Sequence, residues 1–541
     1  MELNETGLAK REQWEEKGYE LPRFDRRRVA AATKENPFWI HFGAGNIFRA
    51  FQANAVQKLL NEDELDKGLI VAEGFDYEII EKLNRPHDDY TILVTLKADG
   101  SVEKTVVGSI VESCILDSDN DKEFNRLKEI FQKDSLQMAS FTITEKGYSL
   151  VNGKGEILPS VLEDLKKGPE RPKSYLGKVA ALLYTRYLAG EKPIAMVSMD
   201  NCSHNGDILS NVMNFFAEEW QEKRLVKSGF VNYIQSKDKV SFPWTMIDKI
   251  TPRPDAAIEK ILKDDGVEQS GPVVTAKNTY AAPFVNAEEC EYLVIEDVFP
   301  NGRPQLEKCG FLFTNRETVD RVEKMKVCTC LNPLHTALAV FGCLLGYERI
   351  SEEMQDEDLK RLVEGIGYTE GLPVVVNPEI LSPKDFLDTV LKVRLPNPFL
   401  PDTPQRIATD TSKKLAIRFG ETIKAYVADK EKKVEDLHLI PLVFAGWLRY
   451  LMGVDDDGKE FTLSPDPLLE TLRPYVEEIR IEEIQKEADT EKLEEKIRPI
   501  LENSDIFGVN LYEVGLAEKV YEYFKEMILG KGAVRKVLQN I

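Results

Sequence analysis

The chain has 541 residues, of which 42% are hydrophobic and 30% charged, and its formal net charge is −22. This length exceeds what one hydrophobic core supports, so we expect at least two domains, and the composition excludes a disordered or lipid-embedded chain. The strong negative charge repels a phosphate backbone and argues against nucleic acid as a partner.

The first 22 residues are too polar for a secretory signal peptide, and the sequence shows no run of the ~18 apolar residues that a membrane span needs. Seven cysteines, odd in number and scattered, are typical of reduced thiols in the cytoplasm. The pair Cys328 and Cys330 lacks a second Cys/His pair at zinc-ligand spacing. We therefore predict a cytoplasmic protein that binds neither membranes nor metal ions.

An alternation of strands and helices is predicted from residue 37 onward. The apolar stretch 37–42 predicts a strand, residues 47–60 have helical periodicity, and 68–75 is an apolar run typical of a buried parallel strand. Further strands are predicted at 90–96, 138–144, 193–199 and 291–299. This pattern predicts an α/β domain with a largely parallel sheet.

From about residue 318 the pattern changes to long helical periodicities. The longest of these stretches are 334–347, 410–429, 439–453 and 489–503. We predict a Rossmann-type NAD-binding domain at 1–308 and a mostly α-helical substrate and catalytic domain at 309–541. The acidic run 476–495 is interpreted as a solvated helix face.

The turn after the first strand resembles the opening of a dinucleotide-binding unit. In such units the first glycine makes the turn, the second lets backbone N–H groups approach the pyrophosphate, and the third packs the helix on the strand. Gly43 and Gly45 suit the first two roles, whereas Phe48 stands where the third glycine is usual. The turn opens a helix, whose positive end favours a phosphate, and Arg49 offers a cation.

An acidic cluster follows the second predicted strand, where a carboxylate usually binds a ribose 2′-hydroxyl. Glu73 and Asp76 form it, and no Arg or Lys occurs between Glu73 and Ile80, so we predict NAD rather than NADP as the cofactor. The predicted cofactor-binding residues are Gly43, Ala44, Gly45, Asn46, Ile47, Phe48, Arg49, Glu73, Asp76, Thr144 and Asn201.

Several stretches together resemble the mannitol dehydrogenase family of polyol-specific long-chain dehydrogenases. They occur in the order seen in that family and lie at 41–53, 140–148, 198–207, 242–254, 294–304, 326–339 and 397–414. The resemblance covers roughly residues 37 to 450. It implies a zinc-independent, NAD(P)-dependent interconversion of a sugar ketone and its secondary alcohol, on a Rossmann-type domain followed by a helical domain. It also accounts for Phe48, since many members lack the third glycine.

The family pattern of a lysine general acid/base followed by Asn-x-x-His falls on Lys326, Asn332 and His335. A lysine acts in this way near neutral pH when burial or neighbouring cations lower its pKa to ~7–8. The match departs from the family in two respects: the asparagine follows the lysine by six positions rather than five, and Pro333-Leu334 replaces the usual Gly-Ser. Lys324 therefore remains a competing base. Because proline follows it, Asn332 is predicted to cap its helix.

The resemblance also implies substrate-binding positions at Asn201, Asp248, Arg406 and Lys414. An arginine there can bind the carboxylate of a hexuronate, although neutral-polyol members also carry basic residues at these places. The helix 331–347 is most similar to the fructuronate reductase branch, which implies interconversion of D-fructuronate and D-mannonate. Tagaturonate reduction and mannitol 2-dehydrogenation remain alternatives, as does an inactive nucleotide-binding module.

Overall fold

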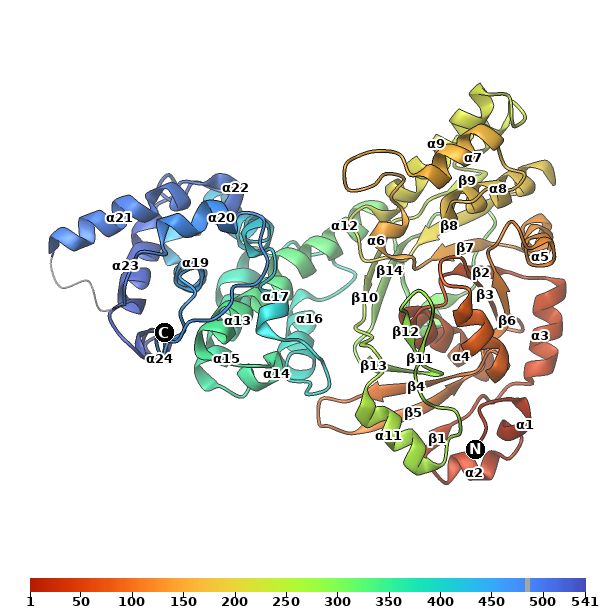
Figure 1. Ribbon diagram of the computed structural model, residues 1–541, viewed down its shortest axis with the longest axis horizontal. Helices are drawn as coiled ribbons and strands as arrows, with labels where there is room; N and C mark the ends of the chain where they lie inside the picture. The colour runs from red at the N-terminus through yellow and green to blue at the C-terminus, as the bar shows by residue number, and fades with distance from the viewer. Residues whose placement is uncertain (482–486) are drawn as a thin grey trace. The chain divides into compact units, whose positions relative to one another are not determined.

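The computed structural model describes residues 1–481 and 487–541. The chain divides into two compact units. In Figure 1 the first is coloured from red to green and the second from green to blue. The first comprises Met1–Lys97 and Ser101–Asp320, and the second Ala98–Gly100 and Arg321–Ile541. The division falls within helix α12 (Arg316–Met325), while the predicted boundary between 308 and 309 lies before that helix.

The first unit is built on a six-stranded sheet in which every neighbouring pair is parallel. Its spatial order is β6-β3-β2-β7-β8-β9, which in chain order reads 3-2-1-4-5-6, the order of a Rossmann sheet. The predicted fold class is therefore confirmed. The strands are β2 (Trp39–Phe42), β3 (Leu69–Glu73), β6 (Ile110–Ile115), β7 (Met138–Phe141), β8 (Ile194–Ser198) and β9 (Val240–Ser241).

Side chains alternate between the two faces of this sheet, and each face has its own hydrophobic core. Ile40 and Phe42 of β2 face a core that includes residues of α5 (Asp121–Gln132), α8 (Tyr175–Leu188) and α9 (Asn205–Glu222). Trp39 faces the opposite core, which includes residues of α4 (Ala53–Asn61). Because both faces are covered, the carboxyl edge of the sheet carries the loops that remain open to a ligand.

Two of the predicted strands lie outside the parallel sheet, which corrects the expectation of one sheet. Strand β4 (Thr91–Leu96) pairs antiparallel with β5 (Val102–Val107) in a sheet ordered β1-β5-β4-β13, and β14 (Tyr292–Glu296) pairs antiparallel with β10 (Thr245–Asp248). Conversely, the edge strand β6 was not predicted, because three of its six side chains are partly exposed and the sequence shows no continuous apolar run there.

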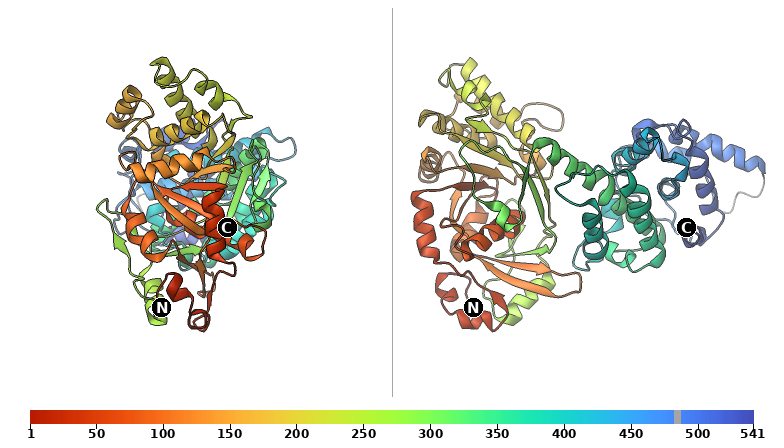
Figure 2. Two further views of the ribbon diagram at one scale, coloured as in Figure 1. Left: turned by 90° about the vertical axis from the view of Figure 1, so that its right-hand side faces the viewer. Right: turned by 180° about the vertical axis from the view of Figure 1, so that it is seen from behind.

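The second unit consists of helices, seen from behind in Figure 2, and every sheet strand in the described ranges precedes residue 315. The prediction that the second domain is mostly α-helical is confirmed. Its main helices are α13 (Asn332–Leu345), α14 (Ile350–Glu353), α15 (Glu357–Glu364), α16 (Pro383–Thr389), α17 (Pro404–Ile407), α18 (Glu421–Ala428), α19 (Leu439–Leu451), α21 (Glu487–Leu501), α23 (Ala517–Met527) and α24 (Ala533–Gln539). The predicted acidic helix face at 476–495 lies partly outside the described residues.

One continuous helix, Arg316–Leu345, passes a length and composition test for a membrane span, contrary to the expectation that no such run exists. Its most apolar 18-residue window has a mean hydropathy of 1.5, but 78% of that window is buried inside the protein. A buried helix of this kind is typical of a protein core.

Glu353 is a fully buried acid in the second unit. Its exposed fraction is 0%, and neither carboxyl oxygen has a hydrogen-bond partner among the described residues. The side chain occupies the space beside Gly342 of α13, where a Cβ atom would lie 2.3 Å from Glu353 Oε1. Burial, with a smaller effect of Asp356 and Glu352, raises the pKa of Glu353 well above its usual value, so the acid is neutral in the fold.

This acid makes the stability of the second unit depend on pH. Above the unfolded pKa of about 4.5 the unfolded chain loses this proton while the folded chain keeps it, so Glu353 lowers stability by about 1.4 kcal/mol per pH unit until its folded pKa is reached. Glu353→Gln does not titrate. The free energy of unfolding of both proteins, measured with denaturant from pH 5 to 8, should increase for the variant relative to the natural chain as pH rises. A difference in unfolding free energy that does not change with pH would contradict a neutral buried acid.

Candidate active site

The two glycines after β2 have different local requirements. Gly43 has φ +107°, and a Cβ atom there would lie 2.3 Å from the carbonyl oxygen of Thr142. Gly45 has no neighbouring atom within 4 Å of such a Cβ position. Gly43 is thus required by the loop itself, whereas the open space beside Gly45 leaves room for the close approach of a ligand.

Phe48 replaces the third glycine without disturbing the loop. It is fully buried and stacks on His41 of β2, with ring centroids 3.9 Å apart and an angle of 2° between the rings. The ring nitrogens of His41 contact Ser140 Oγ at 2.6 Å and Thr142 Oγ1 at 2.8 Å, and burial lowers the pKa of His41 well below its usual value. Phe48 opens a π-helical turn, η1 (Phe48–Gln52), which leads into α4.

Arg49 holds the loop from inside the protein. It is only 4% exposed, donates from Nη1 to the carbonyl oxygen of Ala282 at 2.8 Å, and donates from Nη2 to Asn46 Oδ1 at 2.9 Å. Burial lowers the pKa of this guanidinium to about 10. These contacts fix the side chain of Asn46, and the predicted contact of Arg49 with a cofactor stays a prediction.

Glu73, at the end of β3, joins two loops through backbone hydrogen bonds. Its Oε2 accepts from the N–H of Ala44 at 2.9 Å, and its Oε1 accepts from the N–H groups of Phe75 at 2.7 Å and Asp76 at 3.0 Å. Asp76 in turn accepts from Thr275 Oγ1 at 2.5 Å. Both predicted ribose ligands are therefore engaged within the chain, Glu73 with 5% and Asp76 with 2% of its surface exposed.

Asp200, two residues after the end of β8, also accepts backbone hydrogen bonds from a neighbouring loop, as Glu73 does. It accepts from the N–H groups of Ile143 and Thr144, both at 2.9 Å, and from the hydroxyl of Tyr148 at 2.7 Å. Thr144 is exposed and has φ +64°, so these bonds hold a left-handed turn in place. Sequence reasoning missed Asp200, although an acid directly after a buried parallel strand is a signal for a loop anchor at the carboxyl edge of the sheet.

Asn201 and Asp248, the two substrate positions predicted in the first unit, lie on two segments that hydrogen bonds connect. Asn201 is exposed and follows Asp200 directly. Asn205 donates to the carbonyl oxygens of Asp200 at 2.9 Å and Thr245 at 3.1 Å, which ties the Asn201 loop to β10. Asp248 is the last residue of that strand and is 6% exposed.

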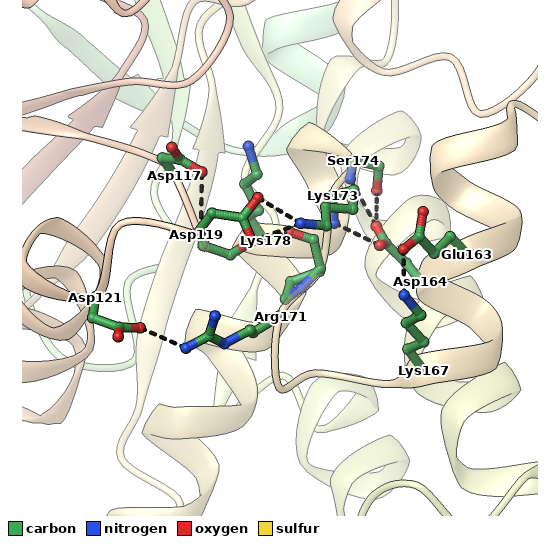
Figure 3. A network of polar contacts seen from close by, with 12 residues as sticks. Asp117, Asp119, Asp121, Glu163, Asp164, Lys167, Arg171, Lys173, Ser174 and Lys178 are labelled. Atoms are coloured by element: carbon green, nitrogen blue, oxygen red, sulfur yellow. Dashed lines mark hydrogen bonds and ion pairs between the residues drawn. The ribbon is translucent and has the colours of Figure 1, made fainter.

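Tyr175, the first residue of α8, provides a further polar group at this edge of the sheet. Its hydroxyl is buried and has no hydrogen-bond partner among the described residues, and a Cβ on Gly74 would lie 2.6 Å from its ring. Asp164 fixes the start of α8 by accepting from the N–H groups of Lys173 and Ser174 (Figure 3). An orphaned donor beside the end of β3 and the open space at Gly45 both fit a bound dinucleotide.

In the second unit, the two candidate lysines differ in burial. Lys326 is 5% exposed, whereas Lys324 is exposed to solvent. Lys326 begins the π-helical segment η5 (Lys326–Cys330), in which its carbonyl oxygen accepts from the N–H of Leu331 at 3.1 Å. A π-helical turn takes one more residue than an α-helical turn, so it accommodates the six-residue spacing between Lys326 and Asn332.

Asn332 is the first residue of α13, and the N-cap is Leu331, which corrects the prediction that Asn332 caps the helix. The physical reason is that the chain enters α13 directly from η5 and leaves no extended residue at Asn332. Asn332 and His335 lie half-buried on the first turn of α13. Backbone N–H groups and the positive end of the helix dipole accompany them there.

His335 and Arg406, which are far apart in sequence, contact the same carboxylate. His335 Nε2 lies 3.2 Å from Asp402 Oδ2, at an angle outside hydrogen-bond geometry, and Arg406 pairs with Asp402 Oδ1. Burial by itself raises the pKa of Asp402, but His335 and Arg406 outweigh burial and hold that pKa below its usual range. Sequence reasoning missed Asp402, although its position four residues before Arg406 is the spacing of a helical ion pair.

Lys414 is half-buried in the same unit. Its Nζ donates to the carbonyl oxygen of Thr409, and burial together with Arg418 lowers its pKa. Arg418 donates to Thr336 Oγ1 of α13 at 2.5 Å. Of these cations, Arg418, which sequence reasoning did not assign, contacts α13 directly, and Lys414 lies close enough to Arg418 for the two charges to interact.

A separate cavity of about 560 Å³ in the first unit contains none of the predicted residues. Its walls include Arg11, Tyr19, Lys58 and Lys249, and its charged groups form ion pairs such as Lys58 with Glu291 at 3.2 Å. Because these charged groups pair with one another, the cavity is weaker evidence for an active site than the residues around Gly45 in the first unit and those around Lys326 in the second.

The glycine turn yields a test by two matched substitutions. Gly43→Ala should lower the melting temperature, because the new Cβ meets a carbonyl oxygen at a positive φ. Gly45→Ala should leave the melting temperature within about 2 °C and weaken dinucleotide binding by at least about tenfold, measured by coenzyme fluorescence. Unchanged binding in Gly45→Ala would contradict a pyrophosphate site at this turn.

The chain is similar to several known proteins. The chain is 52% identical to the D-mannonate oxidoreductase of Thermotoga maritima over 543 residues, covering 100% of this chain and 99% of that protein. Among solved structures, mannitol 2-dehydrogenase of Pseudomonas fluorescens in complex with NAD and D-mannitol has a TM-score of 0.66 and 26% identity, covering 100% and 99% of the two chains. A substrate-free D-sorbitol dehydrogenase has a TM-score of 0.77 at 24% identity, covering 96% and 97%, and shows the fold.

Two family descriptions match consecutive parts of the chain. Residues 38–308 match the mannitol dehydrogenase Rossmann domain, and residues 318–528 match the mannitol dehydrogenase C-terminal domain. The resemblance inferred from seven short motifs is thereby confirmed over nearly the whole length. The chain belongs to the mannitol dehydrogenase family.

Proposed function

We propose that this protein interconverts D-fructuronate and D-mannonate with NAD(H) as the coenzyme. The observation that carries the proposal is its 52% identity, over the full length of both chains, to a protein named D-mannonate oxidoreductase. The buried Lys326 beside the first turn of α13 supports the same chemistry. NAD as the coenzyme is supported by the Rossmann sheet and by the NAD complex of the related mannitol 2-dehydrogenase.

In the proposed reduction, Lys326 supplies the proton that the carbonyl oxygen needs as the ketone carbon becomes a secondary alcohol. Bound NADH supplies the hydride. Asn332 and His335, at the N-terminus of α13, donate hydrogen bonds to the oxygen as negative charge develops on it. Asp402 places a negative charge beside His335, since its carboxylate lies 3.2 Å from the ring nitrogen.

Arg406 and Lys414 are the groups that we assign to the carboxylate of the sugar acid. An arginine binds a carboxylate with two parallel hydrogen bonds, so a uronate gains more from it than a neutral ketose does. Arg406 is already paired with Asp402, and its side chain is 60% exposed, which leaves part of the guanidinium open to a ligand. Asn201 and Asp248 are assigned to the sugar hydroxyls or the nicotinamide ribose.

The alternatives within the same chemistry are reduction of tagaturonate and oxidation of mannitol. An inactive nucleotide-binding module is the alternative from another class. We also propose the cytoplasm as the compartment, which the seven reduced cysteines, most of them buried, support.

A panel of ketoses separates these proposals. With NADH, the protein should reduce fructuronate with a kcat/KM at least about tenfold above that for tagaturonate or fructose, because the proposed pocket selects a carboxylate and one stereochemistry. The reaction is measured by the loss of NADH absorbance at 340 nm. Turnover of fructose alone would overturn the uronate assignment. NADH binding without turnover of any ketose would favour the inactive module.

The base is tested by a pair of lysine variants two residues apart. Lys326→Ala should lower kcat by about 10²- to 10⁴-fold and leave the Kd for NADH unchanged, because the proton donor is lost but the coenzyme site is not. Lys324→Ala is the matched control and should keep near-full activity, since Lys324 is exposed. The opposite pattern would make Lys324 the base.

A further inference from the structure

A small hairpin from a distant part of the chain lies on the loop that follows β3. Its strands are β11 (Val273–Val274) and β12 (Tyr280–Ala281), which pair antiparallel. Thr275 donates to Asp76 Oδ2 at 2.5 Å, with both side chains buried, and the N–H of Ala276 donates to Glu78 Oε2 at 3.3 Å. These contacts fix the hairpin to the end of the strand where a Rossmann fold receives the adenosine ribose.

Lys277, at the turn of this hairpin, extends over the same loop. Its Nζ donates to the carbonyl oxygen of Phe75 at 2.5 Å and lies 4.6 Å from the centre of the Phe75 ring. Lys277 and Phe75 are both exposed, Phe75 by 63%. An ammonium group has three donors, and the described hydrogen bond uses one of them, so the exposed Lys277 has charge and donors to offer a ligand near the Phe75 loop.

The acids that usually exclude a phosphate from this place are engaged elsewhere. A carboxylate that binds the ribose 2′-hydroxyl disfavours a 2′-phosphate, whereas a nearby cation accommodates it. Here Glu73 accepts three backbone N–H bonds and Asp76 accepts from Thr275, and both are at least 95% buried. Glu78, the next acid, forms an ion pair with Lys82 at 2.5 Å. Lys277 thus places an exposed positive charge at the Phe75 backbone.

We propose that Lys277 is a coenzyme-specificity residue that binds the 2′-phosphate of NADPH, so that this protein uses NADPH as well as NADH. The inference rests on the proposed function only in requiring a nicotinamide coenzyme, and it is independent of the sugar. It extends the prediction of NAD, which considered only the residues between Glu73 and Ile80, because Lys277 lies 202 positions beyond Phe75.

Direct binding tests the proposal without any sugar present. Titrations of the full-length protein, followed by coenzyme fluorescence, should give a Kd for NADPH within about tenfold of that for NADH. Lys277→Ala and Lys277→Gln should each raise the Kd for NADPH by about ten- to hundredfold and change that for NADH by less than about twofold, since a charge-assisted bond to phosphate is lost. Lys237→Ala removes an exposed lysine that precedes β9, at the opposite edge of the sheet, and should change neither value.

The proposal would be overturned if the natural protein did not bind NADPH, or if the Lys277 variants bound NADPH with unchanged affinity. It would also be overturned if the variants lost affinity for NADH and NADPH equally, because Lys277 would then serve only to hold the Phe75 loop. Lys277→Gln keeps a hydrogen-bond donor for the Phe75 carbonyl group and so separates the charge from that structural role. A failure of the fructuronate proposal appears in the ketose panel and leaves these binding constants unaffected.

Discussion

The carboxylate of Glu73 is the interaction on which the coenzyme half of this protein depends. It is nearly buried, and it survives there because three backbone N–H groups surround it. Two of these belong to the loop after β3 and one to the glycine turn after β2, so a single side chain sets the distance between the segments expected to hold the pyrophosphate and the ribose. Asp200 repeats the device on the other side of β7.

A buried carboxylate also joins segments within the helical unit. Asp402 brings together His335, from the first turn of α13, and Arg406, from α17. Burial raises the pKa of this acid, but its contacts with His335 and Arg406 outweigh burial and hold the pKa below its usual range. Each unit therefore contains a buried carboxylate that joins segments lying apart in the sequence.

The parts predicted from the sequence are those with a local signal. The strand and turn at Trp39–Gly45 and the helical second domain follow from periodicity and glycine chemistry, and the family follows from short motifs. Strand β6 was missed because an edge strand lacks a continuous apolar run, and β4 was placed in the wrong sheet because pairing partners leave no mark on a single strand. Asp200 and Lys277 were missed because their partners are distant in sequence, as is His335, one of the two partners of Asp402. The predicted N-cap at Asn332 was wrong because a π-helical segment precedes it.

The hairpin that carries Lys277 separates binding of the dinucleotide from the choice between NADH and NADPH, two properties that usually depend on one βαβ unit. The glycine turn and its carboxylate brace are shared by either form of the dinucleotide, whereas the group that distinguishes the two forms sits on an accessory ribbon joined to the sheet by a few polar contacts. Coenzyme choice in this fold can then change through the accessory ribbon, by insertion, deletion or exchange of a few residues, while the core that binds any nicotinamide dinucleotide stays intact.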